Sequence, residues 1–275
     1  SVQTALSETM VTVDAGRGDV SVYIPDSYDS KKPLPLIVAL HGFTGSSEIV
    51  KKYWRMIRLV DEKKFILCVP DGTKNSEDKR FWNATKACCD MEDSGVDDSG
   101  YLRALVELVE SKYTVDQKSI HFLGHSNGGF MSLRMACEHA DKIASVQSLA
   151  GAMFLVGDDH EPSEPVHVLQ VHGTEDKIIK YDGGCWESKC YPSARETVEM
   201  WARFNKCNMV PKQKGTIDLV TNVVGEDTTV LRYTNDESYK VSELWTIHGA
   251  SHGPRFNHSY SPRIVDWVLS HRKQD

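Results

Sequence analysis

Six short apolar runs, separated by segments with helical spacing, constrain the fold of this chain more than any other feature. Each run has the length of a β-strand and is nearly continuous in apolar residues, as parallel strands buried on both faces are. Between the runs, apolar residues recur on one helical face, as at Leu102, Leu105 and Val109. The alternation predicts an α/β fold with a mostly parallel, doubly wound sheet. The runs are residues 36–40, 65–69, 120–123, 145–150, 166–171 and 241–247.

Two further strand pairs are expected outside these runs. Residues 10–13 and 20–24 flank a turn-prone Ala-Gly-Arg-Gly segment, which predicts an N-terminal antiparallel hairpin. A polar stretch later in the chain is expected to hold a second pair, at residues 217–220 and 229–233.

Two helices carry recognisable start signals. Asp97, Asp98 and Ser99 are candidate N-caps for the helix that follows them. Ser261 followed by Pro262 predicts a terminal helix with proline at its first position.

Composition and charge exclude several function classes. The chain has 275 residues, 40% of them hydrophobic, and no linker of biased composition divides it, so we expect a single domain over residues 1–275. The formal net charge is −7 and no basic run is interleaved with aromatics, so neither nucleic acid nor a membrane is an expected partner. The longest apolar run, residues 34–40, is far short of the roughly 20 residues that span a bilayer.

Seven cysteines are many for a cytosolic enzyme, which favours a secreted or periplasmic location; seven reduced thiols in the cytosol are the alternative. The opening residues lack a charged-then-apolar leader, as in a mature form whose leader has been removed. Cys185 and Cys190 bracket a short loop and are expected to be bonded. Adjacent cysteines would be strained if bonded to each other, so Cys88 and Cys89 are expected to have separate partners. The candidates for two longer bridges are Cys88, Cys89, Cys137 and Cys207, which leaves Cys68 as a free thiol.

Four of the apolar runs end in turns that carry reactive or backbone-exposing residues. In an open parallel sheet, ligands bind outside the carboxyl ends of the strands, where such turns gather. The turns are HGFTG at 41–45, GHSNG at 124–128, HGTED at 172–176 and HGASHG at 248–253.

The second turn has the pattern G-x-S-x-G between a strand and a helix. This pattern is typical of a nucleophile elbow, where a tight turn leaves no room for a Cβ at the flanking positions and exposes the serine hydroxyl. Ser126 is therefore the candidate nucleophile. A tight glycine-rich turn without chemistry is the alternative.

A nucleophilic serine needs a base and an orienting carboxylate, which follow it along the chain in this fold. Asp176, in the turn after residues 166–171, is the favoured acid. Glu175 and Asp182 are its rivals, and a solvated turn carboxylate is the alternative reading of all three.

His252 is the favoured base, because it lies in the glycine-rich loop that must reach back to the serine. His248 is its rival, although it falls at the strand end and could simply cap the turn. The two histidines are four residues apart, but Gly249, Gly253 and Pro254 make a helical zinc site improbable, and no H-E-x-x-H motif is present. No metal and no cofactor are expected.

The tetrahedral intermediate also needs hydrogen-bond donors for its oxyanion. The backbone N–H of Asn127 is one candidate. The second is the N–H of Phe43, with Thr44 as the alternative donor, unless this turn is only a glycine turn.

The ordered set of motifs resembles a family of secreted esterases with the α/β-hydrolase fold, which includes polyhydroxybutyrate depolymerases, feruloyl esterases and acetyl xylan esterases. The likeness runs from about residue 36 to residue 271. It implies Ser126 as nucleophile, Asp176 as acid and His252 as base, and it implies secretion. The chain departs from the family at residues 254–256, where Pro-Arg-Phe stands in place of a glycine-rich stretch followed by tryptophan. The motifs are HGFTGSS, FWNATKACCD, VDDSGYLRALV, GHSNGGFMS, HGTEDKIIKYDGG and HGASHG.

Together these features predict a serine carboxylic ester hydrolase that acts through an acyl-enzyme. An acyltransferase or a peptidase on the same triad is the alternative, since all three share it. A non-catalytic binding protein is disfavoured, because it would normally have lost a triad member.

The substrate is expected to reach an open site. Residues 151–165, between two of the apolar runs, are too few for a cap domain. Aromatics in the surrounding loops could form an apolar pocket, although core packing is the alternative for each. We expect hydrolysis of short acyl esters and of polymer-borne or bulky ones, such as polyhydroxyalkanoate-type polyesters or feruloyl esters, with little activity on long-chain triglycerides. The pocket candidates are Phe43, Trp82, Phe154 and Trp186.

Overall fold

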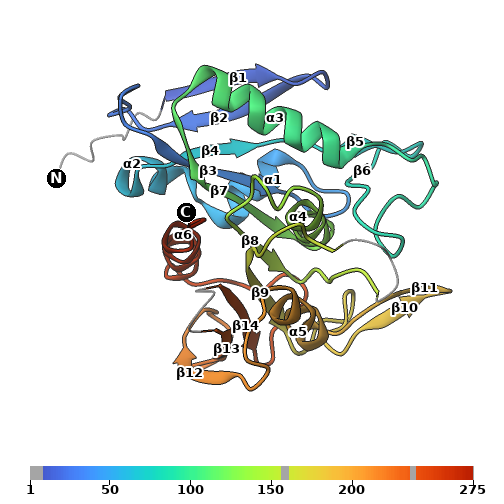
Figure 1. Ribbon diagram of the computed structural model, residues 1–275. Coiled ribbons are helices and arrows are strands. Elements are labelled where there is room, and N and C mark those ends of the chain that lie inside the picture. The colour runs from blue at the N-terminus through green and yellow to red at the C-terminus, as the bar shows by residue number, and fades with distance from the viewer. Residues whose placement is uncertain (1–8, 156–160, 236–239, 275) are drawn as a thin grey trace.

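The computed structural model describes residues 9–155, 161–235 and 240–274, and it places a ten-stranded sheet at the centre of the molecule (Figure 1). Six central strands are parallel, and antiparallel strands extend the sheet at both edges. Two short ribbons lie outside it: β5 (Thr73–Lys74) pairs with β6 (Arg80–Phe81), and β10 (Gly184–Trp186) pairs with β11 (Lys189–Tyr191). In spatial order the strands are β1 (Thr9–Asp14), β2 (Asp19–Ile24), β4 (Ile66–Val69), β3 (Leu34–Leu40), β7 (Val115–His125), β8 (Ser145–Leu149), β9 (His167–Gly173), β14 (Val241–Ile247), β13 (Thr228–Thr234) and β12 (Lys212–Ile217).

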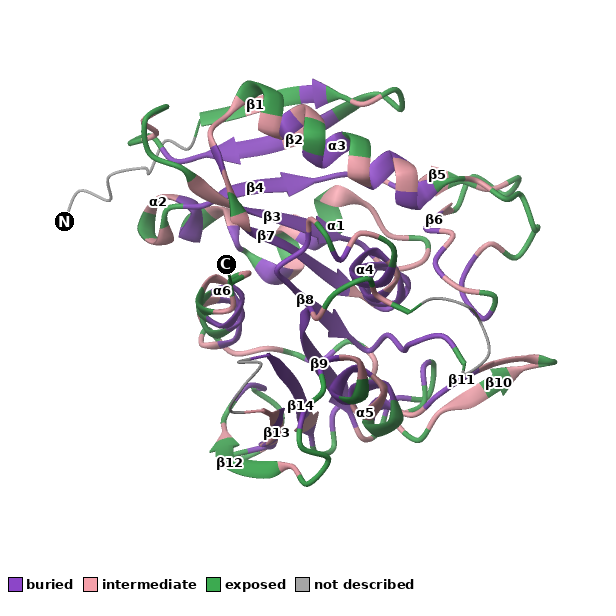
Figure 2. Ribbon diagram, viewed as in Figure 1, coloured by how far each residue is buried: buried purple, intermediate pink, exposed green. Residues whose placement is uncertain are grey.

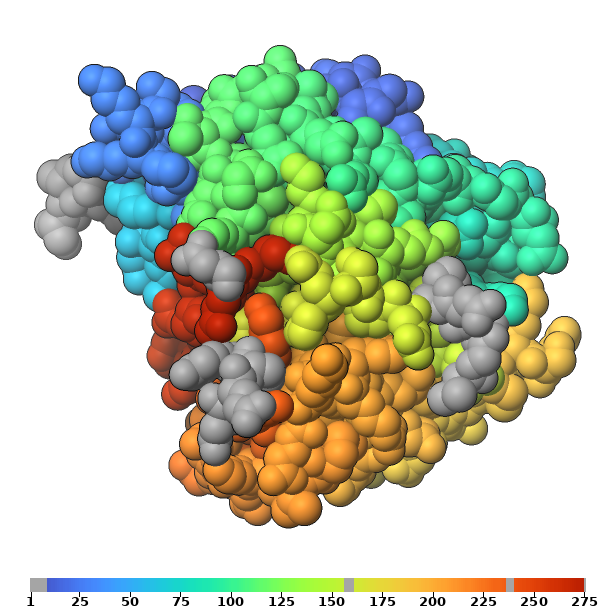
Figure 3. All heavy atoms as spheres, viewed as in Figure 1, coloured from blue at the N-terminus to red at the C-terminus, as the bar shows by residue number. Residues whose placement is uncertain are grey.

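Helices cover both faces of the sheet, so the central strands are buried on both sides (Figure 2). Alternate residues of β3 divide between two cores: Leu36 and Val38 pack with α3 and α4, whereas Ile37 and Ala39 pack with α1, α2 and α6. The space-filling view shows green residues at the top with blue N-terminal residues on either side of them, and orange residues at the bottom (Figure 3). The helices are α1 (Ser47–Trp54), α2 (Val60–Lys63), α3 (Asp98–Lys112), α4 (Asn127–Glu138), α5 (Ala194–Phe204) and α6 (Tyr260–Ser270).

The sequence pattern predicts this architecture well, with shifts at some boundaries. All six apolar runs fall on the parallel strands, and the N-terminal hairpin is present as β1 and β2. Asp97 caps α3 by accepting a hydrogen bond from the N–H of Gly100. The late strand pair is also present, but its first strand, β12, ends at Ile217 where it was expected to begin.

The terminal helix begins two residues earlier than expected. Because α6 starts at Tyr260, Pro262 is its third residue and not its first. The position still tolerates proline, because the first four N–H groups of a helix have no partner within it.

The turns predicted to carry chemistry lie together at the carboxyl edge of the parallel strands. Between β8 and β9, the described residues 150–155 and 161–166 form no helix or strand. The described structure therefore contains no cap over this edge at that point.

No helix in the described ranges is long and apolar enough to cross a membrane.

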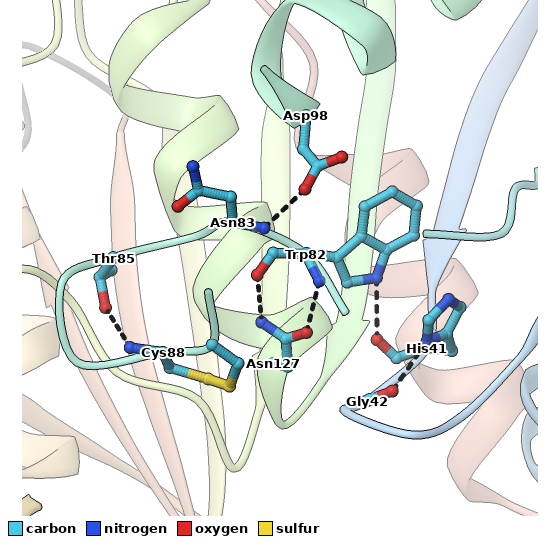
Figure 4. Close-up of a disulfide and its surroundings, with 9 residues drawn as sticks. His41, Gly42, Trp82, Asn83, Thr85, Cys88, Asp98 and Asn127 are labelled. Atoms are coloured by element: carbon cyan, nitrogen blue, oxygen red, sulfur yellow. Dashed lines mark hydrogen bonds between the residues drawn. A yellow bond between two sulfur atoms is a disulfide. The ribbon is translucent and has the colours of Figure 1, made fainter. Parts of the chain in front are cut away.

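The described residues form two disulfides, and one of them corrects the sequence-based pairing. Cys185 and Cys190 are bonded as expected. Cys88 and Cys89 are bonded to each other across a cis peptide, so the expectation of separate partners is wrong (Figure 4). Cys137 is a buried free thiol on α4, and Cys207 is a buried free thiol in a different core cluster, so they do not form the longer bridges. Cys68 is free and buried in β4, as expected.

Alkylation under denaturing, non-reducing conditions should modify three cysteines, Cys68, Cys137 and Cys207, and reduction should expose the other four. Peptide mass mapping reads this directly. A bridge that includes Cys137 or Cys207, or alkylation of Cys88 before reduction, would contradict the pairing.

Two histidines, His121, which is buried, and His125, which is partly buried, make the stability of the fold sensitive to acid. Burial lowers the pKa of His121 to about 3, and its ring contacts the hydroxyls of Ser119 and Ser145 at 2.9 and 2.7 Å. Burial and the neighbouring His252 lower the pKa of His125 to about 4. Both side chains therefore stay neutral in the folded chain at pH values where an unfolded histidine is protonated.

The free energy of unfolding should fall as the pH decreases from about 6.5 to about 4.5, because the unfolded chain then binds protons that the folded chain excludes. Each such histidine contributes about 1.4 kcal/mol per pH unit to this slope. Urea unfolding of His121→Asn should give a slope smaller by about that amount. Equal slopes for the variant and the parent would rule out this origin of acid sensitivity.

Candidate active site

Ser126 lies in a sharp turn between β7 and α4, in a backbone conformation that few non-glycine residues adopt. Its φ and ψ are 55° and −121°, and it forms the N-cap of α4. A Cβ on Gly124 would overlap the carbonyl oxygen of Gly128, and a Cβ on Gly128 would overlap the carbonyl oxygens of Leu40 and His41. Both glycines of the motif are therefore required sterically, and the strained turn has the geometry of a nucleophile elbow.

Asp176 and His252 are joined by a hydrogen bond, although they come from loops after different strands. The distance from His252 Nδ1 to Asp176 Oδ2 is 2.8 Å. The other carboxylate oxygen accepts hydrogen bonds from the backbone N–H groups of Ile178 and Ile179, both at 2.9 Å. Asp176 is thus held in a fixed orientation toward the imidazole.

Asp176 also meets a second histidine that the sequence analysis did not single out. His172 Nε2 lies 3.3 Å from Asp176 Oδ2 and 2.8 Å from the carbonyl oxygen of Ile179. Burial alone would raise the pKa of Asp176, but the hydrogen bonds from His172 and His252 outweigh it and hold the pKa well below its usual range. The carboxylate is therefore ionised at neutral pH. His172 is the last residue but one of β9 and begins the HGTED turn that the sequence marks, and that position was the available signal.

The rival acids and the rival base do not form the pair that Asp176 and His252 form in the described structure. Glu175 and Asp182 are exposed. The ring of His248 lies 2.8 Å from the hydroxyl of Thr229 on β13, through Nε2. The structure therefore brings His252, and not His248, to Asp176.

His125 connects Ser126 to the loop that carries His252. Its Nε2 lies 2.9 Å from the carbonyl oxygen of His252, and the centroids of the two rings are 5.0 Å apart. Ser126 Oγ makes no hydrogen bond to His252 within the described part of the chain. Catalytic hydrogen bonds often tighten only when substrate is bound, so this geometry is compatible with a serine and histidine pair.

Two backbone N–H groups near Ser126 are available as donors. Asn127 is the first residue of α4, where N–H groups have no partner within the helix. The N–H of Thr44 donates to the carbonyl oxygen of Arg80 at 2.8 Å, so it is already engaged. The N–H of Phe43 has no such partner among the described residues, which favours Phe43 over Thr44 as the second donor.

Trp82 belongs to the scaffold beneath the site and does not line an open pocket, which corrects the sequence-based expectation. Its side chain is fully buried, and its indole N–H donates to the carbonyl oxygen of His41 at 3.0 Å (Figure 4). The side chain of Asn127 pairs with the backbone of Trp82, accepting from its N–H at 2.7 Å and donating to its carbonyl oxygen at 2.8 Å. This pairing ties the start of α4 to the loop that contains the Cys88–Cys89 disulfide.

The remaining pocket candidates occupy different places. Phe43 is partly buried and packs against the core. Phe154 is largely buried and lines a hollow of about 270 Å³ together with Asn83 and Arg134. Trp186 lies in β10 (Gly184–Trp186), with its ring centroid 4.9 Å from that of Tyr191. The hollow that Phe154 lines includes neither Phe43 nor Trp186.

Comparison with known proteins identifies the family. Residues 15–251 match the family described as "Putative esterase". The chain belongs to this esterase family. Among its relatives, feruloyl esterase B of Piromyces equi is 27% identical over 241 residues, which cover 85% of this chain and 42% of that protein. Feruloyl esterase C of Emericella nidulans is 30% identical over 166 residues, which cover 58% of this chain and 56% of that protein. The chain thus spans about half the length of these esterase relatives.

Solved structures of esterases share the fold. An acetyl xylan esterase from Aspergillus awamori aligns with a TM-score of 0.64 at 16% identity, covering 95% of this chain and 98% of its own. A ferulic acid esterase from Anaeromyces mucronatus, solved with ferulic acid, aligns with a TM-score of 0.56 at 16% identity, covering 96% and 90%. The predicted α/β-hydrolase fold and the predicted resemblance to feruloyl and acetyl xylan esterases are confirmed.

Proposed function

We propose that this chain is a serine carboxylesterase in which Ser126, His252 and Asp176 form the catalytic triad. The observation that carries the proposal is the hydrogen bond between His252 and Asp176 beside a strained serine in a glycine-bounded elbow. Family membership supports an ester as the bond that is cleaved.

The first half of the reaction makes the acyl-enzyme. His252, with Nδ1–H held by Asp176, takes the proton of Ser126 Oγ through Nε2 as the hydroxyl attacks the ester carbonyl carbon. The N–H groups of Phe43 and Asn127 stabilise the oxyanion. The protonated His252 then gives its proton to the departing alcohol oxygen, and the C–O bond of the ester breaks.

The second half returns the enzyme to its starting state. Water loses a proton to His252 and attacks the acyl carbon, and Ser126 leaves with the proton that His252 returns. The products are a carboxylic acid and an alcohol, and no cofactor takes part.

The substrate class is inferred from the open carboxyl edge of the sheet and from the relatives. The names feruloyl esterase and acetyl xylan esterase indicate that these proteins act on bulky or polymer-borne esters. We infer short acyl esters and hydroxycinnamoyl or polyester esters as substrates, with long-chain triglycerides disfavoured. The disulfides support a secreted or periplasmic location.

A substrate panel tests the reaction class. It pairs 4-nitrophenyl acetate with 4-nitroacetanilide, and adds methyl ferulate, acetylated xylan, poly(3-hydroxybutyrate) and emulsified triolein. We expect hydrolysis of the short esters and of at least one bulky or polymeric ester, with slow cleavage of the anilide and of triolein. Cleavage of the anilide at the rate of the acetate ester would indicate a peptidase. Preferential transfer of the acyl group to added glycerol over water would indicate an acyltransferase.

A further inference from the structure

A basic hollow adjoins the loop that carries His252. Its volume is about 340 Å³, and Gly253 and Pro254, the two residues after the histidine, form part of its wall. The opposite wall comes from the end of α1 and the 3-10 turn that follows it, residues 57–59. Two segments about two hundred residues apart in the sequence therefore enclose it.

The hollow is lined by unpaired positive charges. Lys52, Arg55 and Arg58 come from the α1 side, and Arg255 faces them from the loop after β14. All four are exposed, and none of them forms an ion pair with a carboxylate in the described structure. Among the residues that the structure describes, no aspartate or glutamate lines the hollow, although the chain carries a net charge of −7. A concave surface of one sign concentrates ions of the opposite sign.

Local backbone geometry holds the arginines on the two walls. Arg55 ends α1 in a left-handed conformation with φ of 50°, and its N–H donates to the carbonyl oxygen of Lys51. On the other wall, the backbone N–H of Thr221 donates to the carbonyl oxygen of Arg255 at 2.9 Å. Asn257, which also lines the hollow, donates a hydrogen bond to the carboxylate of Asp218. Within the described ranges, Asp218 forms no ion pair with the arginines of the hollow.

The hollow is physically connected to the candidate triad. The Tyr53 hydroxyl donates to the carbonyl oxygen of Pro254 at 2.9 Å, and the Tyr53 ring lies 5.5 Å from that of His125. His125 in turn contacts His252. Because His252 protonates the departing alcohol in the proposed reaction, the alcohol part of the ester must lie on its side of the site.

We infer that this hollow is a subsite for a carboxylate carried on the alcohol part of the ester. The inference rests on the proposed esterase function and specifies its substrate class. The arginine guanidinium groups can pair with a carboxylate in bidentate fashion, and Tyr53 and Phe256 supply an apolar wall for the carbon skeleton beside it. Hydrolysis then releases an alcohol that still bears its carboxylate. Two sources share this chemistry: a hydroxy acid at the carboxyl end of a polyester chain, and a uronic acid esterified on a hydroxyl.

A matched pair of small esters tests the subsite. The pair is 4-(acetoxymethyl)benzoate, which is anionic, and 4-(acetoxymethyl)benzamide, which is neutral and of similar size. The measured quantity is the ratio of kcat/KM for the anionic ester to kcat/KM for the neutral one. We expect the parent enzyme to favour the anionic ester, and we expect the doubly substituted variant Arg55→Gln with Arg255→Gln to lower the ratio by about tenfold, since charge-assisted contacts to a carboxylate are lost.

Arg203→Gln is the matched control. Arg203 is exposed on the last turn of α5. The residue after this helix, Asn205, forms a hydrogen bond with Val166, which precedes β9, so this end of α5 lies at the opposite edge of the sheet from the hollow. The substitution Arg203→Gln should therefore leave the ratio unchanged. A ratio that the double variant does not lower, or that Arg203→Gln lowers equally, would overturn the subsite while leaving the esterase proposal intact. A parent enzyme that hydrolyses 4-nitrophenyl acetate but neither of these two esters would also overturn the subsite, whereas a parent enzyme that hydrolyses none of the three would overturn the esterase proposal itself.

Two further substrates distinguish the sources of the carboxylate. These are the linear dimer of 3-hydroxybutyrate and an O-acetylated galacturonic acid, each compared with its methyl ester. For each source, the measured quantity is the ratio of kcat/KM for the free acid to kcat/KM for its methyl ester. The source whose ratio falls further in the double variant is assigned to the hollow. No loss with either source would contradict the inference.

Discussion

Ser126→Ala should reduce esterase activity by a factor of about 10⁴ to 10⁶ and leave the protein folded. The hydroxyl is the atom that attacks the ester, whereas the donors of Phe43 and Asn127 remain and supply only residual catalysis. The Ser126 hydroxyl makes no hydrogen bond in the described structure, so its removal breaks no contact that holds the turn. Initial rates on 4-nitrophenyl acetate and thermal unfolding of the same samples measure the two effects separately.

Ser132→Ala is the control for this change. Ser132 lies on the same helix, and its hydroxyl donates to the carbonyl oxygen of Gly128 at 2.9 Å. Its substitution removes a buried hydrogen bond worth about 1 kcal/mol of stability, but no reacting atom. A large loss of activity in Ser132→Ala together with an active Ser126→Ala would place the nucleophile elsewhere.

Asp176→Asn should reduce kcat by about 10⁴. The carboxylate accepts the hydrogen bond from His252 Nδ1 and so leaves Nε2 free to take a proton. An amide nitrogen facing His252 would donate to Nδ1, which places the proton on Nε2 and prevents it from acting as the base. The amide oxygen can still accept from the N–H groups of Ile178 and Ile179, so the turn should persist.

Glu175→Gln is the matched control, because it removes the same charge from the neighbouring residue. Glu175 is exposed, and its backbone N–H donates to the carbonyl oxygen of Ala250 at 2.9 Å. Steady-state rates should change by less than about threefold, as for a solvent-screened charge. A larger loss in Glu175→Gln than in Asp176→Asn would reverse the assignment of the acid.

The sequence singles out all three members of the candidate triad because each of them leaves a local signal. Gly124 and Gly128 mark the elbow, since their positions exclude any Cβ. Asp176 and His252 follow apolar strands that end at one edge of the sheet, so their order along the chain was sufficient to bring them together. The fold was predictable for the same reason: apolar runs and helical spacing are local properties of the chain.

Features that depend on distant contacts were not predictable. Trp82 was expected in a pocket, but its burial follows from contacts with His41 and Asn127, which are 41 and 45 residues away. The pairing of Cys88 with Cys89 depends on the backbone conformation of one turn, which composition does not encode.

The basic hollow could not be predicted from the sequence for a related reason. Its two walls meet through Tyr53 and Pro254, which are 201 residues apart. Arg255 belongs to the Pro-Arg-Phe stretch that departs from the family pattern, and only the structure shows which cations it faces.

Covalent trapping of the nucleophile tests the central claim most directly. A fluorophosphonate should react with the native enzyme at a single serine, abolish esterase activity in proportion to the label incorporated, and appear by peptide mass mapping on the peptide that contains Ser126. The Ser126→Ala variant should incorporate no label, and Asp176→Asn should incorporate it slowly. Stoichiometric label on a different serine, with activity lost in step, would contradict the account.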